Sequence, residues 1–182
     1  MDVVNAFPDE RANWYAVLTR SRQERVAASM LSRLDIPAFL PLMTESRIWS
    51  DRKKVVTVPL FSCYVFVNIQ THSELLLRVL KTPGVVRFVG NQRGPLPIPD
   101  EEIEGVRSVL SKKLDCSPYP FLKTGERVRI VDGALNGLEG TLIGRGPDSK
   151  LVVSIELIQR SLAVSIYDFK VEPAGCVGSL AA

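Results

Sequence analysis

A proline-rich segment near residue 118 separates two stretches of different sequence character. Two prolines stand within three positions in Cys116-Ser117-Pro118-Tyr119-Pro120, and a helix cannot continue through them because proline lacks a backbone N–H and restricts the residue before it. Helix-type and strand-type patterns alternate before this segment, whereas short strand-type patterns between glycine-containing turns follow it. We therefore expect two domains, residues 13–113 and 123–174, joined by a linker over residues 114–122.

The first domain is expected to combine one sheet with helices packed on a face. Its apolar patterns predict strands at 14–19, 36–42, 53–58, 63–67 and 85–89, and helices that begin near residues 21, 71 and 99. The charged residues 44–52 are interpreted as an exposed hairpin loop. This order predicts an α+β fold, specifically an α/β sandwich close to the ferredoxin-like plan.

The first helix is expected to open with the capping box Ser21-Arg22-Gln23-Glu24 and to carry Val26, Met30 and Leu34 on its apolar face. A second capping box, Thr71-His72-Ser73-Glu74, is expected to open the helix that Pro83-Gly84 ends. After the linker, four strand-type runs fall between residues 128 and 166, separated by turns such as Asn136-Gly137. Short strands at this spacing predict a small β-barrel.

Composition and charge exclude several classes of protein. The 182 residues contain no uninterrupted apolar run of the roughly 20 that span a bilayer, and the start lacks a leader pattern, so we expect a cytoplasmic protein without a membrane contact. The formal net charge is only +3, but residues 1–113 hold 16 basic and 12 acidic side chains, so the basic surplus lies there. Cys63, Cys116 and Cys176 are too scattered for a disulfide framework or a zinc site.

Catalytic residues are not expected either. His72 is the single histidine and Cys63 is expected at the start of a buried strand, where thiols are mostly inert. No glycine-rich nucleotide-binding pattern stands between a strand and a helix. We therefore expect a protein that is not an enzyme and that binds no cofactor and no metal, and we interpret the chain as a binding protein.

Two groups of side chains are candidates for binding. Phe61 and Tyr64, with Tyr15 on a neighbouring strand, form an aromatic patch that faces a partner or fills the core. The basic residues of the first helix, Arg20, Arg22, Arg25 and Arg33, suit either a solvated face or phosphate contacts.

Taken in order, several segments resemble the NusG family of transcription elongation factors. They are Trp14-Tyr15-Ala16-Val17, residues 59–67, residues 82–90, Ile98-Pro99-Asp100-Glu101-Glu102-Ile103, and Gly125–Ile130 with Gly133–Leu142, which is similar to a KOW motif. The resemblance implies an NGN-type ferredoxin-like domain followed by an SH3-like KOW barrel. It also implies that Tyr15, Phe61 and Tyr64 bind the clamp helices of the RNA polymerase β′ subunit, with the β gate loop as a further contact, so that pausing and termination are suppressed.

Two departures indicate a specialised paralogue of the RfaH or UpxY type, dedicated to long operons such as those for polysaccharide synthesis. Ser62-Cys63 replaces the usual Pro-Gly, and Ile158-Gln159 replaces the Phe-Gly of the turn that meets Rho or the ribosomal protein NusE in housekeeping members. Leu157 and Ile158 are the expected KOW partner residues. In such paralogues, basic residues of the first helix touch the non-template DNA strand, a role that the resemblance gives to Arg20, Arg22 and Arg33.

Two alternatives remain open at this point. One is a housekeeping factor that couples polymerase to Rho or the ribosome. The other is an RNA- or ribosome-binding KOW module that uses Arg127, Arg129 and Arg145, against which the nearly neutral charge of residues 114–182 counts. In each case we expect a monomer. Under the leading hypothesis, this monomer associates with transcribing polymerase at the nucleoid.

Overall fold

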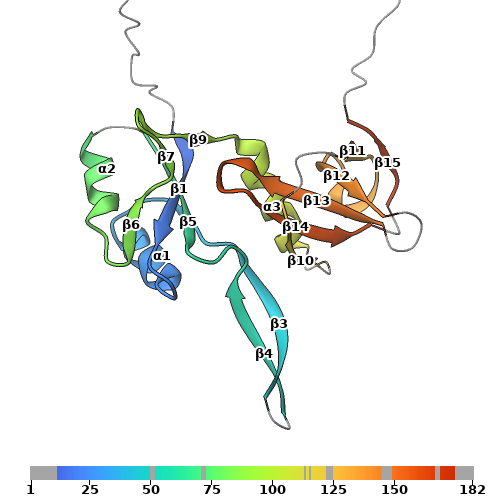
Figure 1. Ribbon diagram of the computed structural model, residues 1–182, viewed down its shortest axis with the longest axis horizontal. Coiled ribbons are helices and arrows are strands. Elements are labelled where there is room, and N and C mark those ends of the chain that lie inside the picture. The colour runs from blue at the N-terminus through green and yellow to red at the C-terminus, as the bar shows by residue number, and fades with distance from the viewer. Residues whose placement is uncertain are drawn as a thin grey trace, which may run out of the picture. The chain divides into compact units, whose positions relative to one another are not determined.

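The computed structural model describes residues 12–49, 52–70, 73–112, 114, 116–121, 125–144, 149–166 and 169–174. The chain folds into two compact units, residues 1–100 and residues 101–182 (Figure 1). The boundaries expected from the sequence, 13–113, 114–122 and 123–174, stay a prediction. Within the described residues, no helix is both long and apolar enough to cross a membrane.

The first unit is built on an antiparallel sheet with the strand order β2-β5-β1-β6, to which β9 adds beside β1. Its elements are β1 (Asn13–Thr19), α1 (Glu24–Arg33), β2 (Ala38–Phe39), β3 (Leu42–Trp49), β4 (Arg52–Pro59), β5 (Tyr64–Ile69), α2 (Ser73–Leu80), β6 (Val85–Phe88), β7 (Gly90–Asn91), β8 (Gly94–Pro95) and β9 (Pro97–Ile98). The four main strands and two helices follow the ferredoxin-like β-α-β-β-α-β plan. The predicted α+β fold class is confirmed.

Helices α1 and α2 cover one face of this sheet. Ala27 and Leu31 of α1 and Val79 of α2 pack on Val17 and Val65 of the two central strands, all with no exposed surface. Side chains alternate between the faces of a strand, so this core contains the odd-numbered residues of β1 and β5. The run predicted as a strand at 63–67 forms β5, which lies between β2 and β1 in the sheet.

The predicted start of α1 is wrong, and its predicted apolar face is confirmed only in part, since Leu34 packs partly buried against the core whereas Val26 does not. The helix begins at Glu24 and its N-cap, Gln23, makes no side-chain capping bond, while Arg22 adopts a φ of 63° that is incompatible with helix. Its buried face carries Glu24, Ala27 and Leu31, whereas Val26 is 45% exposed. The small Ala27 lets the helix approach the sheet closely, and a pattern search that scores only large apolar residues misses that face.

The region predicted as a charged hairpin loop is mostly strand. β3 and β4 pair without interruption from Leu42 opposite Pro59 to Trp49 opposite Arg52, and they project from the central sheet as a two-stranded arm (Figure 1). Charged residues are compatible with such a ribbon because a two-stranded arm has little to bury. Charge alone was therefore a poor signal for a loop.

Helix α2 ends at Leu80, before Pro83-Gly84, as predicted. Thr71 and His72 of its expected capping box lie outside the described residues.

The second unit consists of α3 and a small β domain. Its elements are α3 (Asp100–Ser111), β10 (Cys116–Tyr119), β11 (Glu126–Ile130), a 3₁₀ turn at Gly133–Leu135, β12 (Glu139–Ile143), β13 (Lys150–Ile155), a 3₁₀ turn at Glu156–Ile158, β14 (Arg160–Ser165) and β15 (Val171–Pro173). The strands form one antiparallel sheet in the order β10-β14-β13-β12-β11-β15. Alternating apolar residues such as Val128, Ile130, Leu162 and Val164 supply its buried core, as the sequence pattern predicted.

Part of the expected linker belongs to this sheet. Cys116 to Tyr119 form β10 and pair with β14, with Pro118 opposite Leu162. Proline is tolerated there because β10 is an edge strand, where a missing N–H costs no sheet hydrogen bond on the outer side.

Candidate functional site

The sheet face opposite α1 and α2 carries a cluster of aromatic side chains, here called the aromatic face: Trp14, Phe39, Phe61, Tyr64 and Phe66. The strand register places Phe39 opposite Phe66, so the two rings lie on the same face of the sheet. Phe66 is fully buried, with ring centroids 6.2 Å from Phe39 and 6.2 Å from Phe61. Trp14 meets Phe39 edge-on at 6.4 Å. Such packing stabilises a fixed arrangement of rings.

Phe61 and Tyr64 lie at the two ends of a tight turn that leads into β5. The Tyr64 N–H donates to the Phe61 carbonyl at 3.3 Å, and between them Cys63 adopts a φ of 67°. Phe61 is 2% exposed and packs edge-on against Phe66, whereas Tyr64 is partly exposed. Of these two rings, Tyr64 is therefore the more accessible to a partner, and Phe61 supports the turn from the core.

Tyr15 is not brought together with these two residues. It stands opposite Val67 on the helix-covered face of the sheet, where its ring meets Phe88 edge-on at 6.3 Å. Its neighbour Trp14 points to the aromatic face instead, because side chains alternate along β1. Trp14, Phe39 and Phe66 were missed as members of this cluster. The alternation of side chains along β1 and β5 is the sequence signal for Trp14 and Phe66, whereas Phe39 is placed there only by the pairing of β2 with β5.

A buried carboxylate also reaches the turn. Glu24, in the first turn of α1, is 5% exposed, and its Oε1 accepts a hydrogen bond from the Cys63 N–H at 2.8 Å. The sequence offered no signal for this interaction, because the two residues are 39 positions apart.

The basic residues proposed for DNA binding lie at two separate places. Arg20 and Arg22 flank the turn before α1 and are exposed, while Arg33 is exposed in the last turn of that helix. The ten residues of α1 span about 15 Å. Arg25 is committed to a hydrogen bond with the Thr57 carbonyl at 2.7 Å. Arg20 and Arg22 therefore lie together before the start of α1, whereas Arg33 lies at its far end.

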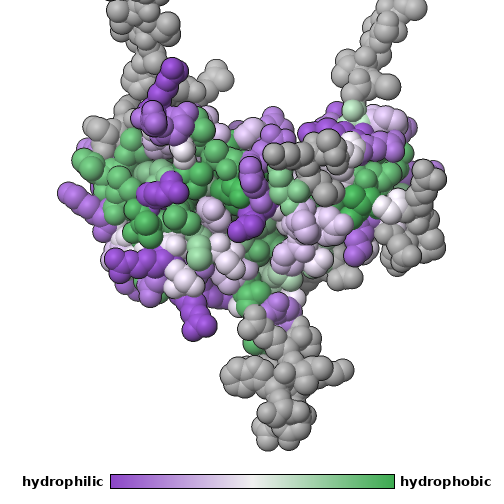
Figure 2. Space-filling view, in the orientation of Figure 1, coloured by the Kyte–Doolittle hydropathy of each residue, from purple (hydrophilic) through white to green (hydrophobic). Residues whose placement is uncertain are grey.

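Exposed apolar side chains gather elsewhere on the first unit, on α2 and β6. Leu77, Leu80 and Val86 are 52%, 41% and 49% exposed, and Figure 2 shows apolar surface in this region, interrupted by polar groups. Leu77 is therefore an exposed apolar side chain on α2, on the helix-covered side of the sheet and away from the aromatic face.

In the β domain, Leu157 and Ile158 occupy the 3₁₀ turn between β13 and β14. Ile158 is only 7% exposed, whereas Leu157 is partly exposed, so Leu157 is the more accessible of the two predicted partner residues. Gln159 follows with φ and ψ of 50° each, in the left-handed region. This is a conformation that glycine adopts without steric cost.

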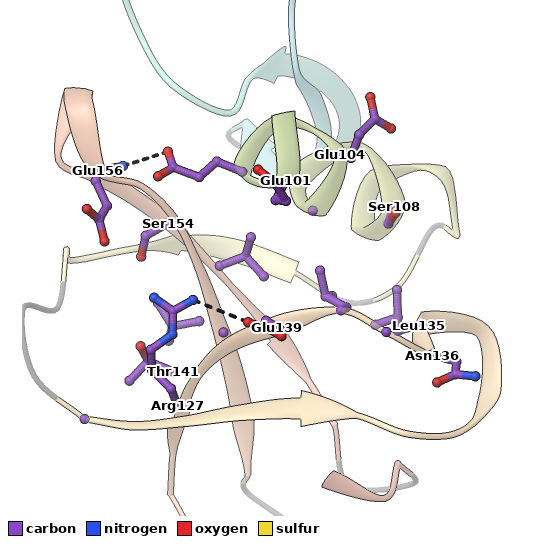
Figure 3. A pocket seen from close by; sticks show the side chains of 18 of the residues that line it. Glu101, Glu104, Ser108, Arg127, Leu135, Asn136, Glu139, Thr141, Ser154 and Glu156 are labelled. Atoms are coloured by element: carbon purple, nitrogen blue, oxygen red, sulfur yellow. Dashed lines mark hydrogen bonds and ion pairs between the residues drawn. The ribbon is translucent and has the colours of Figure 1, made fainter. Parts of the chain in front are cut away.

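A hollow of about 650 Å³ lies between α3 and the strands of the β domain (Figure 3). Glu102 of α3 is half-buried there and accepts a hydrogen bond from the Glu156 N–H at 3.1 Å. Burial raises the pKa of Glu102, and the negative charge of Glu156 adds to the effect, while the hydrogen bond opposes it.

The arginines named for RNA binding are largely engaged within the β domain. The Arg129 Nε donates to Glu139 at 2.9 Å, and the Arg127 guanidinium lies 3.7 Å from the same carboxylate. Arg145 lies outside the described residues. Sharing one carboxylate reduces the net positive charge that Arg127 and Arg129 present to a phosphate backbone. In the described part of the chain, no group of three His, Cys, Asp or Glu side chains is arranged to hold a metal ion.

Comparison with known proteins gives consistent matches. The family model described as "Transcription termination factor nusG" matches residues 12–107. The transcription termination/antitermination protein NusG of Helicobacter pylori is 25% identical over 171 residues, covering 88% of this chain and 97% of that protein. The protein of the same name from Thermus thermophilus is 27% identical over 172 residues, covering 84% and 94%.

Among solved structures, one described as "Domain interaction in Thermotoga maritima NusG" is similar in fold. Its TM-score is 0.54 at 20% sequence identity, and the match covers 88% of this chain and 97% of that one.

Proposed function

The chain belongs to the NusG family of transcription termination and antitermination factors, and on that basis we propose that it binds RNA polymerase at the β′ clamp helices through the aromatic face. The observation that carries the proposal is the turn that holds Phe61 and Tyr64 together, with Tyr64 partly exposed above a buried row of rings. Aromatic side chains on a rigid support are typical anchors of protein interfaces. Tyr15 supports the sheet from the opposite face and is not proposed as a direct contact.

The proposed mechanism is a shift between polymerase states. A factor that binds the closed clamp more tightly than the open one favours the closed, elongating state by the difference of the two binding free energies. Pausing and termination then decrease, and the protein acts where polymerase transcribes, in the cytoplasm at the nucleoid. The activity is one of binding, and it needs no cofactor.

Binding to purified core RNA polymerase tests the proposed interface. We expect the wild-type chain to bind, and Tyr64→Ala to weaken the affinity by roughly 30-fold, the effect of losing an anchor worth about 2 kcal/mol. Leu77→Ala is the matched control, since it removes an exposed apolar side chain away from the aromatic face. A folded Tyr64→Ala variant with unchanged affinity would contradict the proposed interface. Wild-type protein that fails to bind would contradict the proposed function.

Transcription through a terminator in vitro distinguishes the specialised factor from a housekeeping one. We propose antitermination dedicated to particular long operons, because Ile158 is largely buried where a housekeeping partner surface would need an exposed ring. Added protein should increase read-through of a Rho-dependent terminator. Increased termination in the presence of Rho, abolished by Leu157→Ala, would instead establish a coupling role.

A second proposed interaction is with the non-template DNA strand, carried by the exposed Arg20 and Arg22. Removing one side chain that binds a phosphate should reduce the slope of log affinity against log salt by roughly 0.7 for single-stranded DNA. We expect Arg20→Ala with Arg22→Ala to lower that slope for a polymerase complex with an exposed non-template strand. Because Arg33 lies at the other end of α1, Arg33→Ala tests whether the DNA path extends along the helix. An unchanged slope in both the Arg20→Ala/Arg22→Ala double variant and the Arg33→Ala variant would exclude this interaction.

A further inference from the structure

Glu24 is an unusual residue for the buried face of a helix. It stands in the first turn of α1 with 5% of its surface exposed, beside the apolar Ala27 and Leu31. A carboxylate in such a place requires a polar partner, because burial without one is costly. The Cys63 backbone N–H is such a partner, donating a hydrogen bond to the Glu24 Oε1 at 2.8 Å.

Cys63 itself needs an external constraint. Its φ of 67° is a left-handed conformation that a residue with a side chain rarely adopts. Both of its backbone polar groups are held from outside the turn, the N–H by Glu24 and the carbonyl by the Thr19 N–H at 2.8 Å. Strained residues persist where the surrounding structure fixes them from several sides. For Cys63 the two constraints come from Glu24 of α1 and from Thr19 of β1.

We propose that Glu24 is a positioning residue for polymerase binding, whose carboxylate fixes the Phe61–Tyr64 turn in the conformation that presents Tyr64. The inference rests on the proposed function of the aromatic face. Without the carboxylate, Cys63 can relax to negative φ, and the direction of the chain entering β5 changes with it. Tyr64 is the first residue of that strand, so its ring is displaced while the core of the sheet remains intact.

Two substitutions of Glu24 separate this role from a general effect on stability. Glu24→Gln keeps an oxygen acceptor for the Cys63 N–H, whereas Glu24→Ala removes it. We expect polymerase affinity to decrease about tenfold in Glu24→Ala, as for loss of a charge-assisted hydrogen bond, and to stay within about threefold of wild type in Glu24→Gln. The exchange rate of the Cys63 amide hydrogen should increase at least tenfold in Glu24→Ala alone.

A double variant provides a readout that a merely structural role would not change. Glycine adopts positive φ without strain, so Cys63→Gly should restore polymerase affinity in the Glu24→Ala background, whereas the thermal stability lost with Glu24 is regained only in part because its hydrogen bond is not replaced. A folded Glu24→Ala variant that binds polymerase as wild type does would overturn the proposal. So would a Glu24→Gln variant that loses as much affinity as Glu24→Ala.

Failure of the proposed function is distinguishable from failure of this inference. If the wild-type protein does not bind polymerase, the Cys63 amide still reports on the turn in the full chain. Protection in wild type and Glu24→Gln with loss in Glu24→Ala would support positioning of the turn by Glu24. Equal protection in all three proteins would overturn it.

Discussion

Two positions of the β domain, Gly140 and Gly137, disfavour any residue larger than glycine, each for a different physical reason. Gly140, buried in β12, has an ordinary backbone conformation, but a Cβ there would lie 2.6 Å from the Val152 carbonyl oxygen and 2.9 Å from the Leu151 Cγ. Gly137 has a φ of 89° and no atom within 4 Å of the added Cβ. Alanine therefore meets a steric conflict at Gly140 and a conformational one at Gly137.

The two costs are expected to differ. At Gly140 the conflicting atom belongs to the backbone of the adjacent strand β13, so a side-chain rotation cannot relieve it and we expect about 3 kcal/mol, the upper part of the range for overpacking. At Gly137 the left-handed backbone costs about 1–2 kcal/mol. About 0.4–1 kcal/mol of this is offset because alanine restricts the unfolded chain. A net loss of about 0.5–1 kcal/mol remains.

Amide hydrogen exchange on the full chain is the suitable assay. Trp14 and Trp49 both belong to the first unit, so tryptophan fluorescence does not follow unfolding of the β domain. The opening free energy of slowly exchanging amides in β12 and β13 should fall by about 3 kcal/mol in Gly140→Ala and by less than half as much in Gly137→Ala. A larger loss in Gly137→Ala would refute the steric reasoning.

Three further outcomes are expected. Gln159→Gly should stabilise the β domain by about 0.5 kcal/mol, because the left-handed residue loses its strain; a loss of stability in hydrogen exchange would contradict this. Phe66→Ala should cost the first unit about 3–5 kcal/mol in urea unfolding followed by tryptophan fluorescence, since its fully buried ring joins two others; a cost below 1 kcal/mol would show that the ring is replaceable. Glu102 has a raised pKa, so the folded chain holds a proton above pH 4.5 that the unfolded chain has lost, and the free energy of unfolding falls as pH rises from 4.5 through the raised pKa. Glu102→Gln should remove that fall, and identical pH profiles of stability in both proteins would argue against it.

The order of the elements was predictable because it depends on local signals. The apolar run that became β5, the stop at Pro83-Gly84 and the glycine-separated strands after residue 125 each indicate structure within a few residues. The same signals failed where tertiary context decides. A charged stretch became the β3–β4 arm, and the proline-rich Cys116–Tyr119 became an edge strand because a neighbouring strand was available.

The candidate site was predicted only in part, since it depends on strand pairing. Aromatic residue types identified Phe61 and Tyr64, but only the register of β1 against β5 shows that Tyr15 faces the other way and that Phe66 supports the site. Glu24 was invisible for a related reason. A glutamate in a first helical turn is ordinarily a favourable partner of the helix dipole, and nothing local indicates that its carboxylate reaches residue 63.

The turn before β5 shows how a position suited to glycine is occupied by another residue. Left-handed backbone at Cys63 costs about 1–2 kcal/mol, whereas a hydrogen bond to a charged acceptor contributes about 1.5–3 kcal/mol. The Glu24 carboxylate is therefore sufficient to offset the strain of Cys63. It follows that the effects of these two residues are coupled: because Cys63 relaxes once the carboxylate is gone, Cys63→Gly should stabilise the Glu24→Ala protein by less than it stabilises wild type. A double-mutant cycle in urea unfolding measures this difference, and additivity within about 0.3 kcal/mol would show that the hydrogen bond and the positive φ are independent.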